Sequence, residues 1–238
     1  AWAGILHVPG QYSAIQGALN ASLTGDTVLV AAGTYNEYIT WPNTQGIDLL
    51  SESGPDSTLI VGGDLGVIYM NLPLDSTTVI SGFLITNYLH LSPGIGCYNQ
   101  AAPTIRGNII SENAGDPGGG IRCYGSSPII IDNIIRDNVA TSITAPGGGI
   151  LCRDSAAPAI INNIITNNTA NYGGGICCWE YSSPRIIGNT IIGNVAYCSG
   201  GGIDCATESS PEIIDNLIMD NISYSHGAVS YTHLRAHE

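Results

Sequence analysis

Hydrophobic and polar positions alternate over short stretches of the chain, and the same order of stretches recurs. Each repeat holds a Gly-rich triplet, an Ile-x-Cys segment, a Pro-x-Ile segment and two Asn residues five positions apart. The Ile that opens each repeat recurs after 26, 29, 26 and 27 residues, at Ile95, Ile121, Ile150, Ile176 and Ile203. Period-two alternation bounded by Gly, Ser-Pro or Asn is typical of short β-strands joined by turns. No segment of these repeats is long enough for an amphipathic helix.

Several short strands per repeat, in constant register, predict a parallel β-helix in which each repeat forms one coil. Successive coils would stack at about 4.8 Å, the spacing of hydrogen-bonded strands. A leucine-rich horseshoe is excluded because there is no Leu ladder, and propeller blades run to about 40 residues. Repeat length varies between the second Asn and the Gly triplet, so residues 140–146 are interpreted as a loop insertion.

Stacked coils place equivalent residues in columns. In Ile-x-Cys, the Ile and Cys side chains share one face, which we expect to be the interior. The cysteine column is Cys97, Cys123, Cys152, Cys178 and Cys205. We expect free, buried thiols there, because in-register parallel positions rarely suit a disulfide. Cys177, at an x position, is expected to point outward, and Cys198 to lie in a loop.

The Asn residues predict two structural ladders at the bends, where Asn tolerates the left-handed backbone region and can bond to the Asn of the next coil. The first ladder is Asn108, Asn133, Asn163, Asn189 and Asn216. The second is Asn87, Asn113, Asn138, Asn168, Asn194 and Asn221.

The N-terminal segment predicts a helix over about residues 13–23, with Ser13 as N-cap and Ile15, Ala18 and Leu19 on one face. This helix would close one end of the solenoid. The run from Ile5 through Gly33-Thr34-Tyr35, followed by the repeats, resembles the right-handed parallel β-helix proteins of the pectin-lyase-like superfamily, notably secreted bacterial members. The resemblance extends to residue 229. It implies an all-β solenoid but no single activity, because this superfamily holds lyases, hydrolases, esterases, epimerases, adhesins and surface proteins.

The expected organisation is a single domain over residues 4–229, with irregular coils to about residue 66 and regular coils over 67–229. Residues 1–3, Ala-Trp-Ala, resemble the end of a removed export signal, which predicts a secreted or cell-surface protein. Residues 230–238 break the repeat and resemble a translated sequencing adapter, as at the end of a truncated environmental gene. We interpret them as a non-native tail on an interrupted, bacterial-type β-helix, whose uncapped last coil would self-associate.

Composition narrows the function. The net charge is −13, from 6 Arg and no Lys against 19 acidic residues. This charge excludes binding along a nucleic-acid backbone and disfavours binding to anionic membranes. No apolar run could span a membrane. No zinc-ligand spacing and no phosphate-binding loop is present, so no metal and no cofactor is expected.

The outward residues beside the Ile-x-Cys strands are the candidates for substrate binding and catalysis. Aromatic rings near polar groups suit sugar rings, and the substrate-binding candidates are Tyr98, Tyr124, Arg153, Trp179 and Tyr181. Asp154 and Glu180 fall on equivalent positions of neighbouring coils, near the carboxylate spacing of retaining glycosidases, and Asp204 lies one coil further on. These three are the catalytic candidates.

Two hypotheses remain open. The first is a secreted or surface module with a binding or structural role, with neutral polysaccharide or cell-surface glycan as its partner. The second is a polysaccharide hydrolase or lyase that uses the acidic residues of the same face. The superfamily's catalytic sets do not appear: no Lys is present, and no Gly-His-Gly accompanies an Asp pair. The negative charge also disfavours polyuronates.

Overall fold

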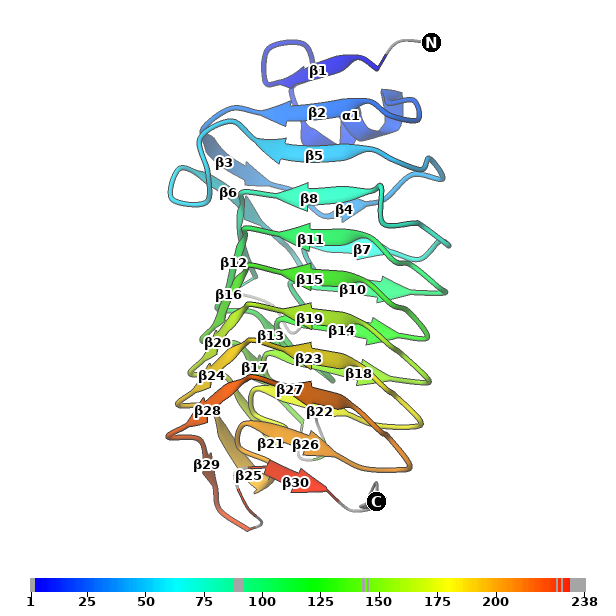
Figure 1. The fold of residues 1–238 in the computed structure, drawn as a ribbon. Coiled ribbons are helices and arrows are strands. Elements are labelled where there is room, and N and C mark those ends of the chain that lie inside the picture. Colours follow the sequence, from blue (N-terminus) through cyan, green and yellow to red (C-terminus); the bar gives the residue numbers. More distant parts are fainter. Residues whose placement is uncertain are drawn as a thin grey trace.

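The chain winds into a single parallel β-helix (Figure 1), as predicted. The computed structural model describes residues 3–87, 92–142, 144, 146–225, 227 and 229–231, and the side chains of 230 and 231 are not described. Of the predicted export-signal remnant (residues 1–3) and the predicted tail (residues 230–238), residues 1–2 and 232–238 lie outside the described residues, whereas 230 and 231 continue a strand from residue 229.

The described strands form four sheets along the solenoid axis, which we name A to D. Sheet A contains β1 (Ile5–Val8), β2 (Thr27–Val30), β5 (Asp48–Ser51), β8 (Val79–Ser81), β11 (Thr104–Arg106), β15 (Ile129–Ile131), β19 (Ala159–Ile161), β23 (Arg185–Ile187) and β27 (Glu212–Ile214). Sheet B contains β3 (Gly33–Asn36), β6 (Thr58–Val61), β9 (Leu84–Thr86), β12 (Ile109–Ser111), β16 (Ile134–Arg136), β20 (Ile164–Thr166), β24 (Thr190–Ile192) and β28 (Leu217–Met219).

Sheet C, the Ile-x-Cys sheet, contains β4 (Ile39–Thr40), β7 (Ile68–Met70), β10 (Ile95–Tyr98), β14 (Ile121–Tyr124), β18 (Ile150–Arg153), β22 (Ile176–Cys178), β26 (Ile203–Cys205) and β30 (Val229–Tyr231). Sheet D contains β13 (Ala114–Gly115), β17 (Val139–Ala140), β21 (Thr169–Tyr172), β25 (Val195–Ser199) and β29 (Ile222–Ser223). The named strands pair in parallel, and in regular coils the chain passes from A through B and D to C.

The cysteine column is confirmed as an interior feature. Cys97, Cys123, Cys152, Cys178 and Cys205 pair in register through sheet C, with Met70 in the same column. All five are thiols rather than disulfides, and they are buried among Ile side chains from sheets A, B and C. Burial raises the pKa of the Cys97 thiol far above its usual range, so the column consists of neutral, weakly polar groups.

The Asn ladders are confirmed as hydrogen-bonded stacks. From Asn108 to Asn189 and from Asn113 to Asn194, the Nδ2 of each ladder Asn donates to Oδ1 of the Asn one coil further on, at 2.9–3.1 Å. Asn87 is an exception: it donates to the Ser92 carbonyl, and Oδ1 of Asn113 has no partner. The second ladder therefore begins at Asn113.

The expected left-handed backbone at the ladder Asn residues was wrong. The residue before each ladder Asn carries the positive φ instead, as at Asp132 (55°) and Asp137 (57°). Asp, Asn and Gly dominate these positions because they adopt this conformation at least cost. The bend thus leaves the ladder Asn itself free to point inward.

Helix α1 (Ile15–Ala21) buries Ile15, Ala18 and Leu19 against the first coils, as the sequence predicts. Its N-cap is Ala14 rather than Ser13, and no side chain caps it locally. The carboxylate of Glu37 accepts the Ile15 and Gln16 backbone N–H groups at 2.8 and 2.9 Å. A residue 22 positions away therefore satisfies the helix N-terminus, and a local capping rule could not have found it.

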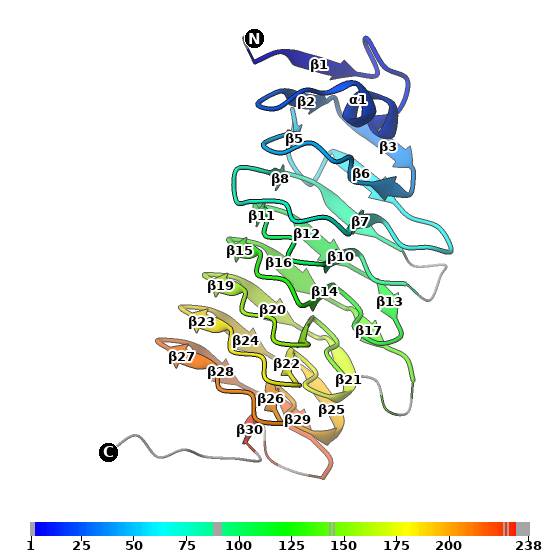
Figure 2. The same cartoon turned by 90° about the vertical axis from the view of Figure 1, so that its right-hand side faces the viewer.

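The Gly triplets allow the chain to fold back on itself between sheets D and C. After β13, β21 and β25 the chain turns and returns through the triplet toward sheet C (Figure 2). The triplet lies directly against backbone. A Cβ at Gly119 would lie 2.7 Å from the Gly148 carbonyl oxygen and 2.8 Å from the backbone nitrogen of Val139. Only glycine fits at these positions. We call this double layer of chain the folded-back loops (residues 114–120, 139–142, 144, 146–149, 169–175 and 195–202).

The last coils are less covered than the others. Apolar side chains that are 39% exposed or more gather there: Ile214, Leu217, Met219, Ile222 and Tyr224. The self-association expected at this end remains a prediction.

Among the described residues, no helix is long and apolar enough to cross a membrane.

Candidate functional site

The outer face of sheet C is divided into two parts. Over the later coils the folded-back loops cover the x positions of Ile-x-Cys: Leu151, Cys177 and Asp204 are buried, and a Cβ at Gly147, Gly173 or Gly200 would contact them. The expectation that Cys177 points outward was therefore wrong. Sequence alternation assigns a side chain to the outer face but does not reveal a second layer of chain above it.

Over the earlier coils the same face carries a row of tyrosines in mutual contact. The ring centroids of Tyr38 and Tyr69 are 6.3 Å apart, those of Tyr69 and Tyr98 are 5.1 Å apart, and those of Tyr98 and Tyr124 are 5.8 Å apart. The Arg153 guanidinium continues the row, 5.7 Å from the Tyr124 centroid. We call Tyr38, Tyr69, Tyr98 and Tyr124 the tyrosine row; it spans four coils along the solenoid axis.

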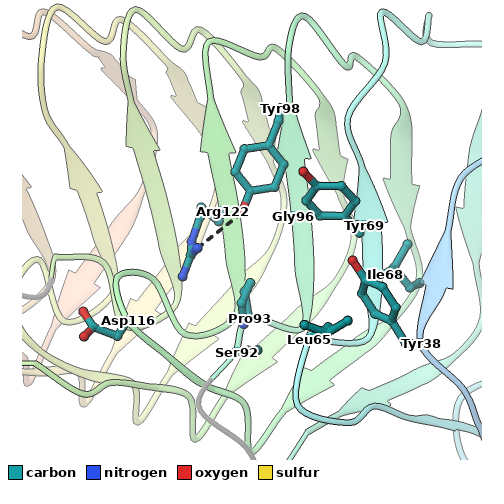
Figure 3. Close-up of a pocket in the computed structure, with 11 residues that line it drawn as sticks. Tyr38, Leu65, Ile68, Tyr69, Ser92, Pro93, Gly96, Tyr98, Asp116 and Arg122 are labelled. Carbon is teal, nitrogen blue, oxygen red and sulfur yellow. Dashed lines mark hydrogen bonds between the residues drawn. The ribbon is translucent and has the colours of Figure 1, made fainter.

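A pocket of about 360 Å³ lies beside this row (Figure 3). Tyr38, Tyr69 and Tyr98 form one side of the pocket. Leu65, from the loop before β7, and Pro93, from the loop before β10, lie across from them. Gly96, which also lines the pocket, occupies the x position of β10, where later coils carry larger side chains. A Cβ at Gly96 would lie 2.6 Å from Cε2 of Tyr98, so glycine both leaves the space and permits the tilt of the ring.

Arg122 is the cation of this pocket. Its Nη1 donates to the Tyr98 hydroxyl at 3.2 Å and its Nη2 to the Pro117 carbonyl, while Nε–H is buried without an acceptor. Burial raises the pKa of Tyr98, and the nearby Arg122 guanidinium opposes that shift. Tyr98 is thus a neutral hydroxyl at neutral pH.

The acidic candidates lie in different environments. Glu180 forms a bidentate pair with Arg153, at 2.6 and 2.5 Å, and these hydrogen bonds lower the pKa of its carboxyl. Glu180 is therefore ionised and neutralised at neutral pH. Asp154 is exposed on the turn after β18, at φ 60°, one coil from Glu180.

Asp204 is 2% exposed and accepts hydrogen bonds from Ser199 Oγ at 2.6 Å and Trp179 Nε1 at 3.1 Å. The Trp179 ring packs 5.2 Å from that of Tyr172. These contacts hold the folded-back loop to sheet C and keep the Asp204 carboxylate away from the exposed surface. Tyr181, 58% exposed, lies on the turn after Trp179.

The structure thus brings together Tyr98, Tyr124, Arg153 and Glu180 and separates them from Asp204. Sequence reasoning missed Tyr38, which comes from an irregular coil, and it missed Tyr69 and Arg122, which occupy x positions of the regular coils. The x-position equivalence of Tyr69 and Gly96 was the available signal. Within the described ranges, no cluster of three or more His, Cys, Asp or Glu side chains could hold a metal ion.

Comparison with known proteins agrees with the architecture. The family model for the right-handed β-helix region matches residues 93–235. The chain belongs to the right-handed β-helix family. The model begins at the coil of β10, so the β-helix family match includes Tyr98 and Tyr124 but not Tyr38 or Tyr69.

Among solved structures, the chain is similar to an alginate lyase from Paenibacillus sp. str. FPU-7. The two are 12% identical, with a TM-score of 0.44, over 96% of this chain and 99% of that chain. No curated protein matches the chain.

Proposed function

We propose that this β-helix protein is a secreted or cell-surface module that binds carbohydrate along the tyrosine row. The supporting observation is the contact of four tyrosine rings across four coils beside a pocket. Tyrosine offers an apolar ring to the C–H face of a sugar and a hydroxyl to its rim. Because the row follows the solenoid axis, an extended chain of sugars would lie parallel to that axis.

Charge favours a neutral glycan over a polyuronate. The protein carries −13 overall, and one of the two cations of this face, Arg153, is already paired with Glu180. A polyanion would meet repulsion from the whole molecule and find little free positive charge.

Binding to a panel of insoluble and soluble neutral polysaccharides tests the proposal. Tyr69→Ala removes a ring from the middle of the row and should weaken binding roughly three- to tenfold, the equivalent of one aromatic contact. Tyr224→Ala is the matched control, since Tyr224 is 69% exposed and stacks on Tyr197 away from the pocket. No binding to any glycan, or equal losses in both variants, would refute the proposal.

The alternative function is a polysaccharide hydrolase or lyase. One observation favours it: Asp154 and Glu180 occupy equivalent turns of neighbouring coils, and Ser155 N–H donates to the Glu180 carbonyl at 2.8 Å. A retaining hydrolase needs one carboxyl kept protonated, whereas the pKa of Glu180 is lowered by Arg153. Glu180 would thus serve as the anionic partner, with Asp154 as the second carboxyl of the pair. Release of reducing ends or unsaturated products that is lost in Asp154→Asn would establish this activity.

A further inference from the structure

The pocket beside the tyrosine row has the size of a single sugar unit. Its volume of about 360 Å³ is near the lower end of the range for small-molecule sites, roughly 300–1,000 Å³. An extended glycan that lies along the row would place one ring, with one substituent, inside the pocket. The lining then determines which substituent fits.

On the polar side of the pocket, the Arg122 guanidinium has more N–H donors than it has acceptors in the structure. A guanidinium carries five N–H donors, and that of Arg122 has two acceptors, the Tyr98 hydroxyl and the Pro117 carbonyl. Its Nε–H is buried and unpaired. The hydroxyl of Ser92, also in the lining, already donates to the Asp64 carbonyl at 2.7 Å. The ligand atom best suited to this side is therefore an acceptor oxygen.

The charge of the lining disfavours an anionic substituent. Arg122 and Asp116 are the two charged residues among those that line the pocket, so their formal charges cancel. A carboxylate or sulfate ester would gain from Arg122 but would meet Asp116 and the net charge of −13. A neutral acceptor, such as a carbonyl oxygen, keeps the attraction to the guanidinium without that repulsion.

The remaining side of the pocket is apolar. Leu65, Ile68 and Pro93 lie in the same lining, and Leu65 is 69% exposed, so it has surface to bury against a ligand. A substituent with a carbonyl oxygen at one end and a methyl group at the other satisfies both sides. That substituent is an acetyl group.

We propose that the pocket selects an acetylated sugar unit, with Arg122 donating to the acetyl carbonyl and Leu65 and Pro93 packing on its methyl group. This inference rests on the proposed function, because it concerns which glycan the tyrosine row holds. The acetyl group can come from an N-acetylated sugar or from an O-acetyl ester, and the two sources share this chemistry.

Calorimetric titration of the full chain with two matched, neutral ligand pairs tests the inference. The first pair is the β-1,4 hexamer of N-acetylglucosamine and that of glucose; the second is O-acetylated xylo-oligosaccharide and its de-esterified form. At least one acetylated member should bind about tenfold or more tightly than its partner, as expected for one hydrogen bond from a charged donor. The pair that shows the preference identifies the source of the acetyl group.

Two variants assign the preference to this pocket. Arg122→Met removes the donors and should bring the ratio of the two affinities close to one, and Leu65→Ser, on an exposed loop, should reduce the ratio without affecting folding. Arg136→Met is the control, since Arg136 pairs with Asp137 on sheet B and does not line the pocket.

Equal affinities within both pairs, tighter binding of galacturonate oligomers, or a ratio unchanged in Arg122→Met and Leu65→Ser would overturn the acetyl assignment and leave glycan binding standing. Absence of binding to every member would overturn the proposed function together with the inference.

Discussion

Replacing one ladder Asn with Ala should destabilise the solenoid far more than its size suggests. Asn163 is 1% exposed in the middle of the first ladder. Its Nδ2 donates to the carbonyls of Ile130 and Ile161, at 2.9 and 3.0 Å, and to Oδ1 of Asn189 at 3.0 Å. Its Oδ1 accepts the backbone N–H and the Nδ2 of Asn133, at 2.9 and 3.0 Å. Asn163→Ala removes all five bonds.

The magnitude follows from which groups lose their partner. The Asn133 backbone N–H loses its acceptor inside the solenoid, where water cannot replace it; a buried orphan of this kind costs about 1–3 kcal/mol. The Asn133 side chain keeps bonds to the Ile105 and Ile131 carbonyls, so its loss is partial. With the Ile130 carbonyl also deprived of a donor, we expect Asn163→Ala to lower the free energy of unfolding by about 2–4 kcal/mol.

Urea denaturation followed by circular dichroism measures the free energy of unfolding, and amide hydrogen exchange reports on the Asn133 N–H directly. Asn162→Gly is the matched control, because Asn162 is exposed at φ 53°, a conformation that glycine adopts freely. The control should change stability by under about 0.5 kcal/mol. A loss below about 1 kcal/mol in Asn163→Ala, with Asn133 still as protected as Asn108, would refute the reasoning.

Four further predictions follow from the same structure. Gly119→Ala places a Cβ 2.7 Å from a backbone oxygen, so it should lower the free energy of unfolding by more than about 2 kcal/mol in urea denaturation. Gly63→Ala is the control: a Cβ there has nothing within 4 Å, and the free energy of unfolding should hardly change. Arg153 lowers the pKa of the Glu180 carboxyl. The pair therefore stabilises the fold fully above the ordinary Glu pKa of about 4.3, and this stabilisation is lost as the pH falls through the lowered pKa. The difference in melting temperature between wild type and Glu180→Gln should accordingly shrink from pH 7 to pH 3. A thiol reagent at neutral pH should label Cys198 in the folded chain and leave the buried cysteine column unmodified until denaturant is added, and rapid labelling of two or more thiols would contradict this. Analytical ultracentrifugation should show concentration-dependent self-association that weakens when Lys replaces the exposed apolar residues of the last coils, Ile214, Leu217, Met219 and Ile222.

The sequence predicted those parts of the fold in which each residue contacts the residue at the same position of the next coil. The cysteine column and both Asn ladders are of this kind, because in-register stacking converts a sequence period directly into a spatial neighbour. Contacts between different parts of a coil leave no such period. The Glu37 carboxylate at the helix N-terminus and the folded-back loops above Cys177 and Asp204 belong to this second kind, and both were missed.

The candidate site shows the same division. Tyr98 and Tyr124 were found because they follow consecutive column cysteines, and Arg153 continues that column. Tyr38 joins the row from a loop before β4, where the coils are irregular and the repeat gives no register. The acidic candidates were grouped by register alone, although Glu180 is neutralised by Arg153 and Asp204 is buried under the folded-back loop.

The position of the pocket follows from one column. At the x position of sheet C, later coils carry Arg122, Leu151, Cys177 and Asp204, and the folded-back loops cover the last three of these side chains. At Gly96 the column has no side chain, so the space stays open and the Tyr98 ring leans across it. A solenoid built from identical coils would bury this face along its whole length. A binding site on such a scaffold therefore needs a break in the repeat. In this chain the break is Gly96, because the neighbouring coils carry larger residues at the same position.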